Sequence, residues 1–207
     1  MILVKNQKIK QNIADEAMLG PGNQYRTSDC SVLAAFLADL EPSKRIDRIQ
    51  RLEKDESKRH SSYLSVMPLT VSFLLGEGHA ATALKHAATS IVSPVLPAPQ
   101  IEATDAWSTK QTALVAQSFV LAATSHELAS SMMEGFDPRR LKEILRIPDR
   151  YKVPLVVALG YDHETEDKAS RTARLGISEV VFGDVFGQPL EAADDTDDNQ
   201  LVAVTSM

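Results

Sequence analysis

The sequence is nearly free of cysteine. One cysteine, Cys30, occurs in 207 residues, which excludes an internal disulfide framework and fits a reducing compartment. It adjoins an apolar run, which favours a buried, inert thiol over a reactive one. No apolar run is long enough to cross a bilayer, and the opening residues, MILVKNQKIK, hold too short an apolar stretch for a signal peptide. These absences predict a cytoplasmic protein.

Positive charge is also scarce. The 22 Lys and Arg residues are outnumbered by 28 Asp and Glu residues, and the net charge is -6. This argues against a general nucleic-acid binder, although it leaves room for a local basic pocket for a phosphate. The most charged stretch, residues 44–60, is expected to be a helix with a solvated face and with Ile46, Ile49 and Leu52 turned inward.

Motifs for metal binding and for nucleophilic catalysis are missing. The sequence has no C-x-x-C, G-x-S-x-G, P-loop or G-x-G-x-x-G. Its five histidines lack the spacing of metal ligands, and His126 is the only one near a stretch of functional interest. Hydrolysis through an activated nucleophile and Rossmann-type cofactor binding therefore have no support, and we expect no metal.

The length and a hydrophobic content of 43% suit one domain with a real core. We expect that domain to span residues 1–190 and to be followed by an acidic, disordered tail over residues 191–207. Strands are predicted at 2–4, 32–38, 154–160 and 179–182. Helices are predicted at 6–18 and over 64–92, the latter broken at residues 76–78. Residues 23–29 are predicted to form a polar surface stretch.

The most informative stretch runs from residue 107 to residue 140. Residues 107–124 form a helix pattern that is apolar nearly all round, so the helix is buried in a core or at a subunit interface. Residues 130–136 are expected to be a small, flexible connection with Glu134-Gly135 at its tip. A new helix then begins, because Asp137 is a good N-cap and Pro138 suits the first helical position.

This arrangement resembles the nitroreductase family of flavin-dependent enzymes. The family's motif is a Trp-led buried helix with a Lys-Gln pair near its start, followed by a turn of small residues and E-G-F-D. In this sequence the matching residues are Trp107, Lys110, Gln111, Glu134, Gly135, Phe136 and Asp137. The resemblance implies an α+β fold, in which a central, mostly antiparallel sheet is flanked by helices.

The resemblance also implies an FMN site and NAD(P)H as hydride donor. Arg171 and Arg174 would hold the FMN phosphate, and Asn23 and Arg26 would reach the pyrimidine edge of the flavin. The backbone N–H groups at the turn would approach flavin N5. The implied cofactor-binding residues are Asn23, Arg26, Met133, Glu134, Gly135, Arg171 and Arg174. Without the resemblance, the two later arginines would be read as solvent-facing and the earlier pair as a surface turn.

The start of the chain departs from the family pattern. Members usually begin with an R-R-S-x-R-like segment that grips the FMN phosphate, whereas this sequence begins inside the first strand, at Ile2-Leu3-Val4. We expect the chain to lack that segment and at least one helix. It is then either an incomplete copy of a normal enzyme or a genuine short form. Any organelle signal would lie on the absent end.

Two functions follow from these observations. The first is an FMN-dependent oxidoreductase that passes hydride from NAD(P)H through flavin N5 to a nitroaromatic, a quinone or a similar small acceptor. The long apolar helices predict a homodimer with the flavin between subunits, and no nucleic-acid or membrane partner is expected. The alternative is a non-catalytic dimerisation or binding module that retains the core of the fold but has lost stable flavin.

Overall fold

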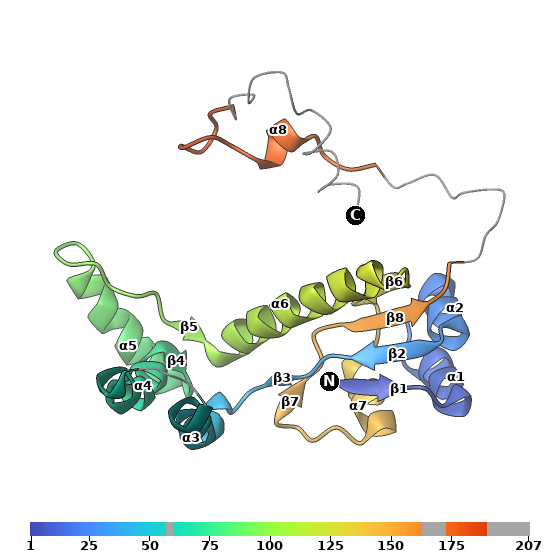
Figure 1. The fold of residues 1–207 in the computed structure, drawn as a ribbon, viewed down its shortest axis with the longest axis horizontal. Helices are drawn as coiled ribbons and strands as arrows, with labels where there is room; N and C mark the ends of the chain where they lie inside the picture. The colour runs from blue at the N-terminus through green and yellow to red at the C-terminus, as the bar shows by residue number, and fades with distance from the viewer. Residues whose placement is uncertain (57–59, 163–172, 190–207) are drawn as a thin grey trace. The chain divides into compact units, whose positions relative to one another are not determined.

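The structure, a computed structural model, describes residues 1–56, 60–162 and 173–189. The chain divides into two compact units, Met1–Tyr161 and Asp162–Met207, each described here by itself. The first unit contains a four-stranded sheet and the helices that cover it (Figure 1). The predicted domain boundary at residue 190 stays a prediction, because residues 190–207 lie outside the described ranges.

The central sheet has the order β1-β2-β8-β6, and every neighbouring pair is antiparallel. Its inner strands are β2 (Val32–Ala35) and β8 (Val156–Gly160), paired in the register Leu33↔Ala158. Its edges are β1 (Ile2–Val4) and β6 (Ala129–Met133). The predicted strands at 2–4, 32–38 and 154–160 are therefore confirmed, and the two apolar runs are the inner strands, as expected for segments covered on both faces.

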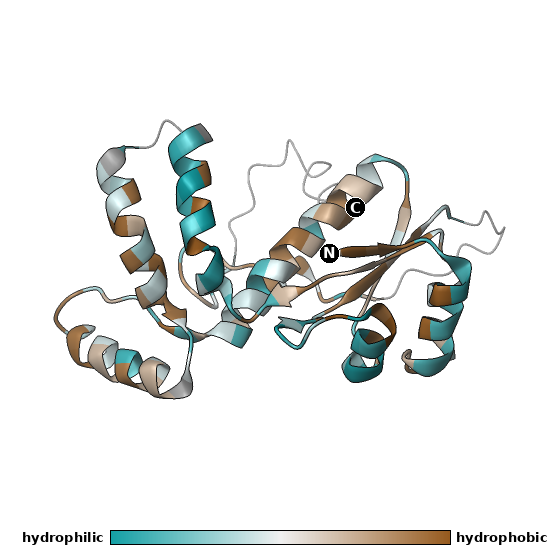
Figure 2. Ribbon diagram, turned by 90° about the horizontal axis from the view of Figure 1, so that it is seen from below, coloured by the Kyte–Doolittle hydropathy of each residue, from teal (hydrophilic) through white to brown (hydrophobic). Residues whose placement is uncertain are grey.

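Side chains alternate between two cores, one on each face of the sheet. Leu33 contributes to the core formed with α1 (Gln7–Glu16) and α7 (Pro138–Leu145), and Phe36 contributes to the core under α6 (Thr104–Ser125). Phe36 meets Phe119 of α6 edge to face, with ring centroids 5.5 Å apart. Figures 1 and 2 show the hydrophobic strands lying between these helices. The predicted α+β class with a helix-flanked antiparallel sheet is confirmed.

Between β2 and α6 the chain leaves the central sheet and forms a mostly helical segment (Figure 1). It contains a 3-10 turn η1 (Pro42–Arg45), α3 (Ile46–Glu56), α4 (Ser61–Leu74) and α5 (His79–Val92). A short parallel pair, β4 (Leu75–Gly76) with β5 (Glu102–Ala103), closes it. The predicted break at residues 76–78 is confirmed. Of the three residues expected to turn inward on the charged helix, Ile46 is buried, whereas Ile49 and Leu52 are each 47% exposed.

Three other predictions were wrong. Residues 130–136 are no flexible connection, because most of them form β6, whose backbone pairs with β8 from Ala129↔Gly160 to Met133↔Val156. Residues 23–29 belong to helix α2 (Pro21–Asp29). Gly20, at φ +75°, is the N-cap residue of α2, and Pro21 occupies its first helical position. In the second unit, the predicted strand at 179–182 overlaps a short helix, α8 (Ile177–Val180).

Helix α6 is apolar nearly all round, as predicted, but only one side of it is buried in this chain. Ala116 and Ala123 pack on the sheet, while Leu114 and Val115 are each 61% exposed and Leu121 is 52% exposed. Among the described residues, no helix combines the length and apolar character needed to traverse a bilayer.

An ion pair fixes the chain where it leaves the sheet. Arg150 donates from Nε to Asp39 Oδ1 at 2.7 Å and from Nη2 to Asp39 Oδ2 at 2.5 Å. The two lie where β3 (Ala38–Asp39) pairs with β7 (Tyr151–Lys152). The Ser108 hydroxyl donates to the Asp39 carbonyl at 2.6 Å and so adds the first turns of α6. One carboxylate residue therefore joins β3, β7 and α6.

Acid should remove the stabilisation from this pair. The hydrogen bond from Arg150 is the main reason that the pKa of Asp39 lies below its ordinary value. A carboxyl with a depressed folded pKa stabilises the fold above its unfolded pKa of about 3.9, and the contribution is lost as the pH falls through the folded pKa. We expect Asp39→Asn to lower the free energy of unfolding at pH 7, and its difference from wild type to shrink below about pH 5. Urea denaturation at several pH values measures this, and a difference constant down to pH 3 would contradict it.

A second prediction concerns the cap of α7. The Asp137 carboxylate accepts from the backbone N–H groups of Arg139 at 2.9 Å and Arg140 at 3.1 Å. We expect Asp137→Ala to lower the free energy of unfolding by about 1 kcal/mol. Asp137→Asn keeps an acceptor oxygen and should stay near wild type. Chemical denaturation compares the three proteins, and an equal loss in both variants would show that charge, not capping, is responsible.

Candidate functional site

The residues after β6 turn sharply and lie against the junction of α1 and α2. Phe136 N–H donates back to the Glu134 carbonyl at 2.9 Å, which closes the turn. Leu19 N–H donates to the Gly135 carbonyl at 2.9 Å, and Asp137 N–H donates to the Ala17 carbonyl at 2.7 Å. Backbone hydrogen bonds therefore hold the E-G-F-D segment in register against residues 17–19.

Asn23 and Arg26 lie beside this turn. Asn23 Nδ2 donates to the Gly135 carbonyl at 3.2 Å and to the Leu19 carbonyl at 3.0 Å. Arg26 Nη1 donates to Asn23 Oδ1 at 3.4 Å. Both side chains come from α2, one helical turn apart, so they share a face of that helix. The structure thus brings together Asn23, Arg26 and the Glu134-Gly135 turn, which are more than 100 residues apart in sequence.

Two backbone N–H groups of the turn, those of Glu134 and Gly135, have no hydrogen-bond acceptor among the described residues. Its Phe136 and Asp137 N–H groups are bonded, as described above. Within residues 1–56, 60–162 and 173–189, the N–H groups of Glu134 and Gly135 donate to no protein acceptor. Glu134 is exposed and Gly135 is half-buried. Two consecutive N–H groups without a protein acceptor form a surface suited to a ligand with hydrogen-bond acceptors or negative charge.

The other predicted site residues lie elsewhere or outside the described chain. The Met133 side chain is buried in the core, 4% exposed, and its backbone pairs with Val156, so its role as a cofactor-binding residue stays a prediction. Arg174 belongs to the second unit, where its Nη1 donates to the Ala173 carbonyl at 3.3 Å. Arg171 falls outside the described residues. The phosphate role of these two arginines stays a prediction.

Two further residues of the sequence motif lie near the start of α6. Lys110 forms an ion pair with Glu102 at 2.6 Å. Gln111 and Trp107 help to line a cavity of about 280 Å³ next to Phe36 and Asp39. These residues join α6 to the sheet and to β5, so this part of the motif has a structural role here.

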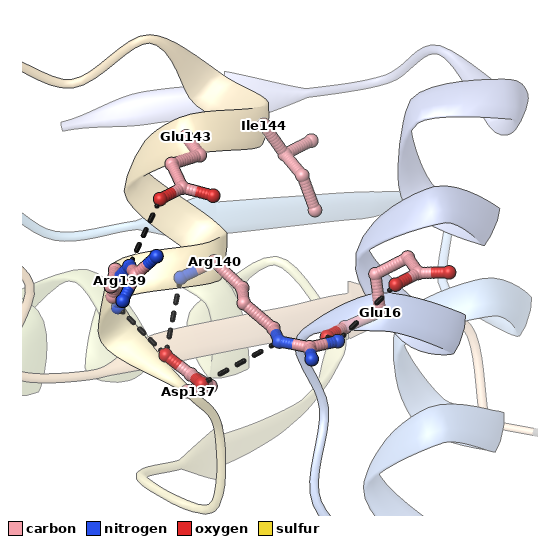
Figure 3. A pocket seen from close by; sticks show the side chains of 6 residues that line it. All are labelled: Glu16, Asp137, Arg139, Arg140, Glu143 and Ile144. Atoms are coloured by element: carbon pink, nitrogen blue, oxygen red, sulfur yellow. Dashed lines mark hydrogen bonds and ion pairs between the residues drawn. The ribbon is translucent and has the colours of Figure 1, made fainter.

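A cavity of about 520 Å³ lies next to the turn, where α7 faces the end of α1. Figure 3 shows the side chains that line it, Glu16, Asp137, Arg139, Arg140, Glu143 and Ile144. Both cations there already have carboxylate partners. Arg140 pairs with Glu16 at 3.2 Å and lies 3.7 Å from Asp137, and Arg139 pairs with Glu143 at 3.1 Å. A phosphate would have to compete with these carboxylates, so we assign no anion site here. Reasoning from the sequence missed this cluster, although the basic pair after D-P was a visible signal.

The remaining reactive groups do not build a second centre. Burial raises the pKa of the Cys30 thiol, whose Sγ donates to the Thr27 carbonyl at 3.3 Å, so the predicted buried thiol is confirmed. His126 ends α6 and helps to line an apolar cavity of about 380 Å³. Across the described ranges, no three His, Cys, Asp or Glu side chains come close enough to hold a metal ion.

Comparisons with known proteins agree with this geometry. A "NADH dehydrogenase" of Thermus thermophilus is 38% identical over 81 residues, which is 39% of this chain and 38% of that protein. The nitroreductase-family protein of Streptococcus pneumoniae superposes with a TM-score of 0.61 at 22% identity, covering 87% of this chain and 76% of that one. A nitroreductase-type protein of Exiguobacterium sibiricum, solved in complex with FMN, gives 0.56 at 16% identity, covering 87% and 73%.

The profile of the nitroreductase family matches residues 3–161. That range contains all of the four-stranded sheet except Ile2, together with the α1–α2 junction and the E-G-F-D turn. The match covers well over half of the sequence and stops where the first compact unit ends. The chain belongs to the nitroreductase family.

Proposed function

We propose that this protein is an FMN-dependent oxidoreductase that transfers hydride from NAD(P)H to a nitroaromatic, a quinone or a similar small acceptor. The observation behind the proposal is the pair of free N–H groups at Glu134 and Gly135, in a turn that Asn23 connects to Arg26 of α2. The names of the Thermus relative and of the Exiguobacterium neighbour, with NADH and FMN respectively, support the choice of donor and cofactor.

The residues at the turn fit a flavin. A flat ring system needs close approach of backbone, and the turn presents the N–H groups of two consecutive residues. The N–H groups of Glu134 and Gly135 can donate to ring acceptors. Bound FMN would supply the redox chemistry, accepting hydride at N5 and passing two electrons to the acceptor.

Arg26 is assigned an electrostatic role. Its guanidinium is exposed apart from the bond to Asn23 Oδ1, so most of its donors face outward. A fixed cation near the pyrimidine edge stabilises the negative charge that develops there on reduction. Together with the backbone donors, it lets this chain favour the reduced cofactor without a strong acid or base.

Arg174 and Arg171 are proposed to hold the FMN phosphate. Arginine suits this task because its planar fork can bind two phosphate oxygens at once. The support for this assignment is the resemblance around Arg174-Leu175, and Arg174 is exposed in its own unit.

The exposed apolar surface supports a homodimer, with the flavin between subunits. On α6 it includes Leu114, Val115 and Leu121. On α4 and α5 it includes Leu69, which is 76% exposed, and Leu84, which is 73% exposed. Apolar side chains gathered along neighbouring helices mark surfaces that associate with another chain. We also propose that the protein works in the cytoplasm.

Titration of the purified chain with FMN tests the function. We expect binding at micromolar concentrations or tighter, followed by absorbance and quenching of flavin fluorescence, and NAD(P)H oxidation by the loaded protein. Arg174→Ala should raise the dissociation constant by about 10- to 100-fold, because it removes charge-assisted hydrogen bonds of about 1.5–3 kcal/mol.

Lys8→Ala, an exposed cation on α1, serves as the control and should leave binding unchanged. If wild type does not bind FMN, the enzyme proposal fails and the non-catalytic binding module is favoured. If wild type binds and Arg174→Ala binds equally well, only the phosphate assignment is wrong.

The dimer is tested by analytical ultracentrifugation. We expect the wild-type chain to sediment as a dimer and Leu121→Glu to shift it toward monomer, because a carboxylate buried in an apolar interface loses its hydration. Gln11→Glu adds the same charge on α1, which covers the other face of the sheet, and should remain dimeric. A monomeric wild-type protein would refute the proposed assembly.

A further inference from the structure

The orientation of the Asn23 amide is set by its neighbours. Its NH₂ group faces two backbone carbonyls, those of Leu19 and Gly135, and its oxygen faces the Arg26 guanidinium. A flipped amide would set its oxygen against two carbonyl oxygens and its NH₂ against a cation, so the partners decide the assignment. Both hydrogens of Nδ2 are thereby committed to the protein.

Gly135 leaves the space that this amide occupies. A Cβ built on Gly135 would overlap Asn23 Nδ2. The backbone angle does not require glycine, because the glycines with positive φ among the described residues are Gly20, Gly78 and Gly187. Glycine is needed at position 135 because the Asn23 side chain approaches so closely. The two residues form a matched pair that joins α2 to the turn.

The Gly135 carbonyl consequently accepts two hydrogen bonds, from Leu19 N–H at 2.9 Å and from Asn23 Nδ2 at 3.2 Å. These bonds fix the peptide plane that follows Gly135, and the bond from Phe136 N–H to the Glu134 carbonyl fixes the turn on its other side. The directions of the free N–H groups of Glu134 and Gly135 depend on that backbone. The hydrogen bond from Leu19 N–H holds the Gly135 carbonyl in place, and the bond from Asn23 Nδ2 restricts the orientation of its peptide plane.

We propose that Asn23 is a positioning residue: through its bond to the Gly135 carbonyl it aims the N–H groups of Glu134 and Gly135 at the bound cofactor. Its NH₂ group acts on the protein, and Oδ1 orients Arg26 beside the same site. This inference rests on the proposed FMN binding for its functional consequence, but the positioning itself is a property of the cofactor-free chain.

Three single variants of the full chain separate the parts of this idea. Asn23→Ala removes both the donor and the acceptor. Asn23→Asp keeps an acceptor for Arg26 but turns a second oxygen toward the Gly135 carbonyl. Tyr25→Ala is the control, since this 66% exposed residue lies two positions along α2 and so on another side of the helix.

The first measurement is made without cofactor. In ¹⁵N-labelled protein, the amide resonances of Glu134 and Gly135 should move in Asn23→Ala and Asn23→Asp and stay in place in Tyr25→Ala. If they stay in place in Asn23→Asp, Asn23 does not position the turn. In titrations with FMN, both variants should bind about tenfold more weakly, which corresponds to about 1.4 kcal/mol for one lost hydrogen bond. The bound flavin's reduction potential should also change in both.

A double-variant cycle supplies a second test. Gly135→Ala should lower the melting temperature strongly in wild type, because its Cβ displaces the Asn23 amide, and less in the Asn23→Ala background. Equal losses in the two backgrounds would overturn the pairing of these residues. If wild type fails to bind FMN, the proposed function fails, while the resonances and the cycle still decide whether Asn23 positions the turn.

Discussion

The candidate site depends on the pairing of β8 with β2 on one side and with β6 on the other. That pairing lays Met133 opposite Val156 and thereby delivers the following turn to the α1–α2 junction. A shift of one residue would exchange the two faces of the edge strand and would carry Met133 out of the core. Core packing opposes such a shift, because Leu33 and Val156 are fully buried in the same core as Met133. Ordinary core packing thus fixes the position of the ligand donors.

Much of the fold could be predicted from the sequence. The inner strands are continuous apolar runs, and Asp137-Pro138 marks a helix start, so both were found from local signals. Edge strand β6 was missed because its letters, ASSMM, have little intrinsic preference for a strand; its pairing with β8 decides its conformation. Helix α2 was missed because Gly20-Pro21-Gly22 was interpreted as the end of one helix, whereas Gly20 is the N-cap and Pro21 the first residue of the next.

The residues of the candidate site could be predicted from the sequence, but the hydrogen bonds between them could not. The site residues were predicted from the spacing of Asn23 and Arg26 and from the E-G-F-D motif. The structure joins Asn23, Arg26 and Gly135 by hydrogen bonds. No local pattern could show that the Asn23 amide faces a carbonyl 112 residues away. Such a bond depends on how α2 packs beside the turn, which is a tertiary property. The same holds for Arg140 and Glu16, which meet across 124 residues.

Two groups with shifted pKa values, Cys30 and Asp39, lie in the core and at a strand pair and not at the E-G-F-D turn. The Cys30 thiol is displaced by burial, and Asp39 is displaced by its bond to Arg150 at the pairing of β3 and β7. The proposed flavin chemistry would require no protein acid or base of matched pKa, because the electrons would enter and leave through the cofactor. In the proposed chemistry the protein holds backbone N–H donors at fixed angles. It also holds a cation, Arg26, whose position is set by the neighbouring Asn23 amide. A site of this kind is sensitive to small shifts in backbone angle, so a side chain that fixes one carbonyl has more influence than its single hydrogen bond suggests.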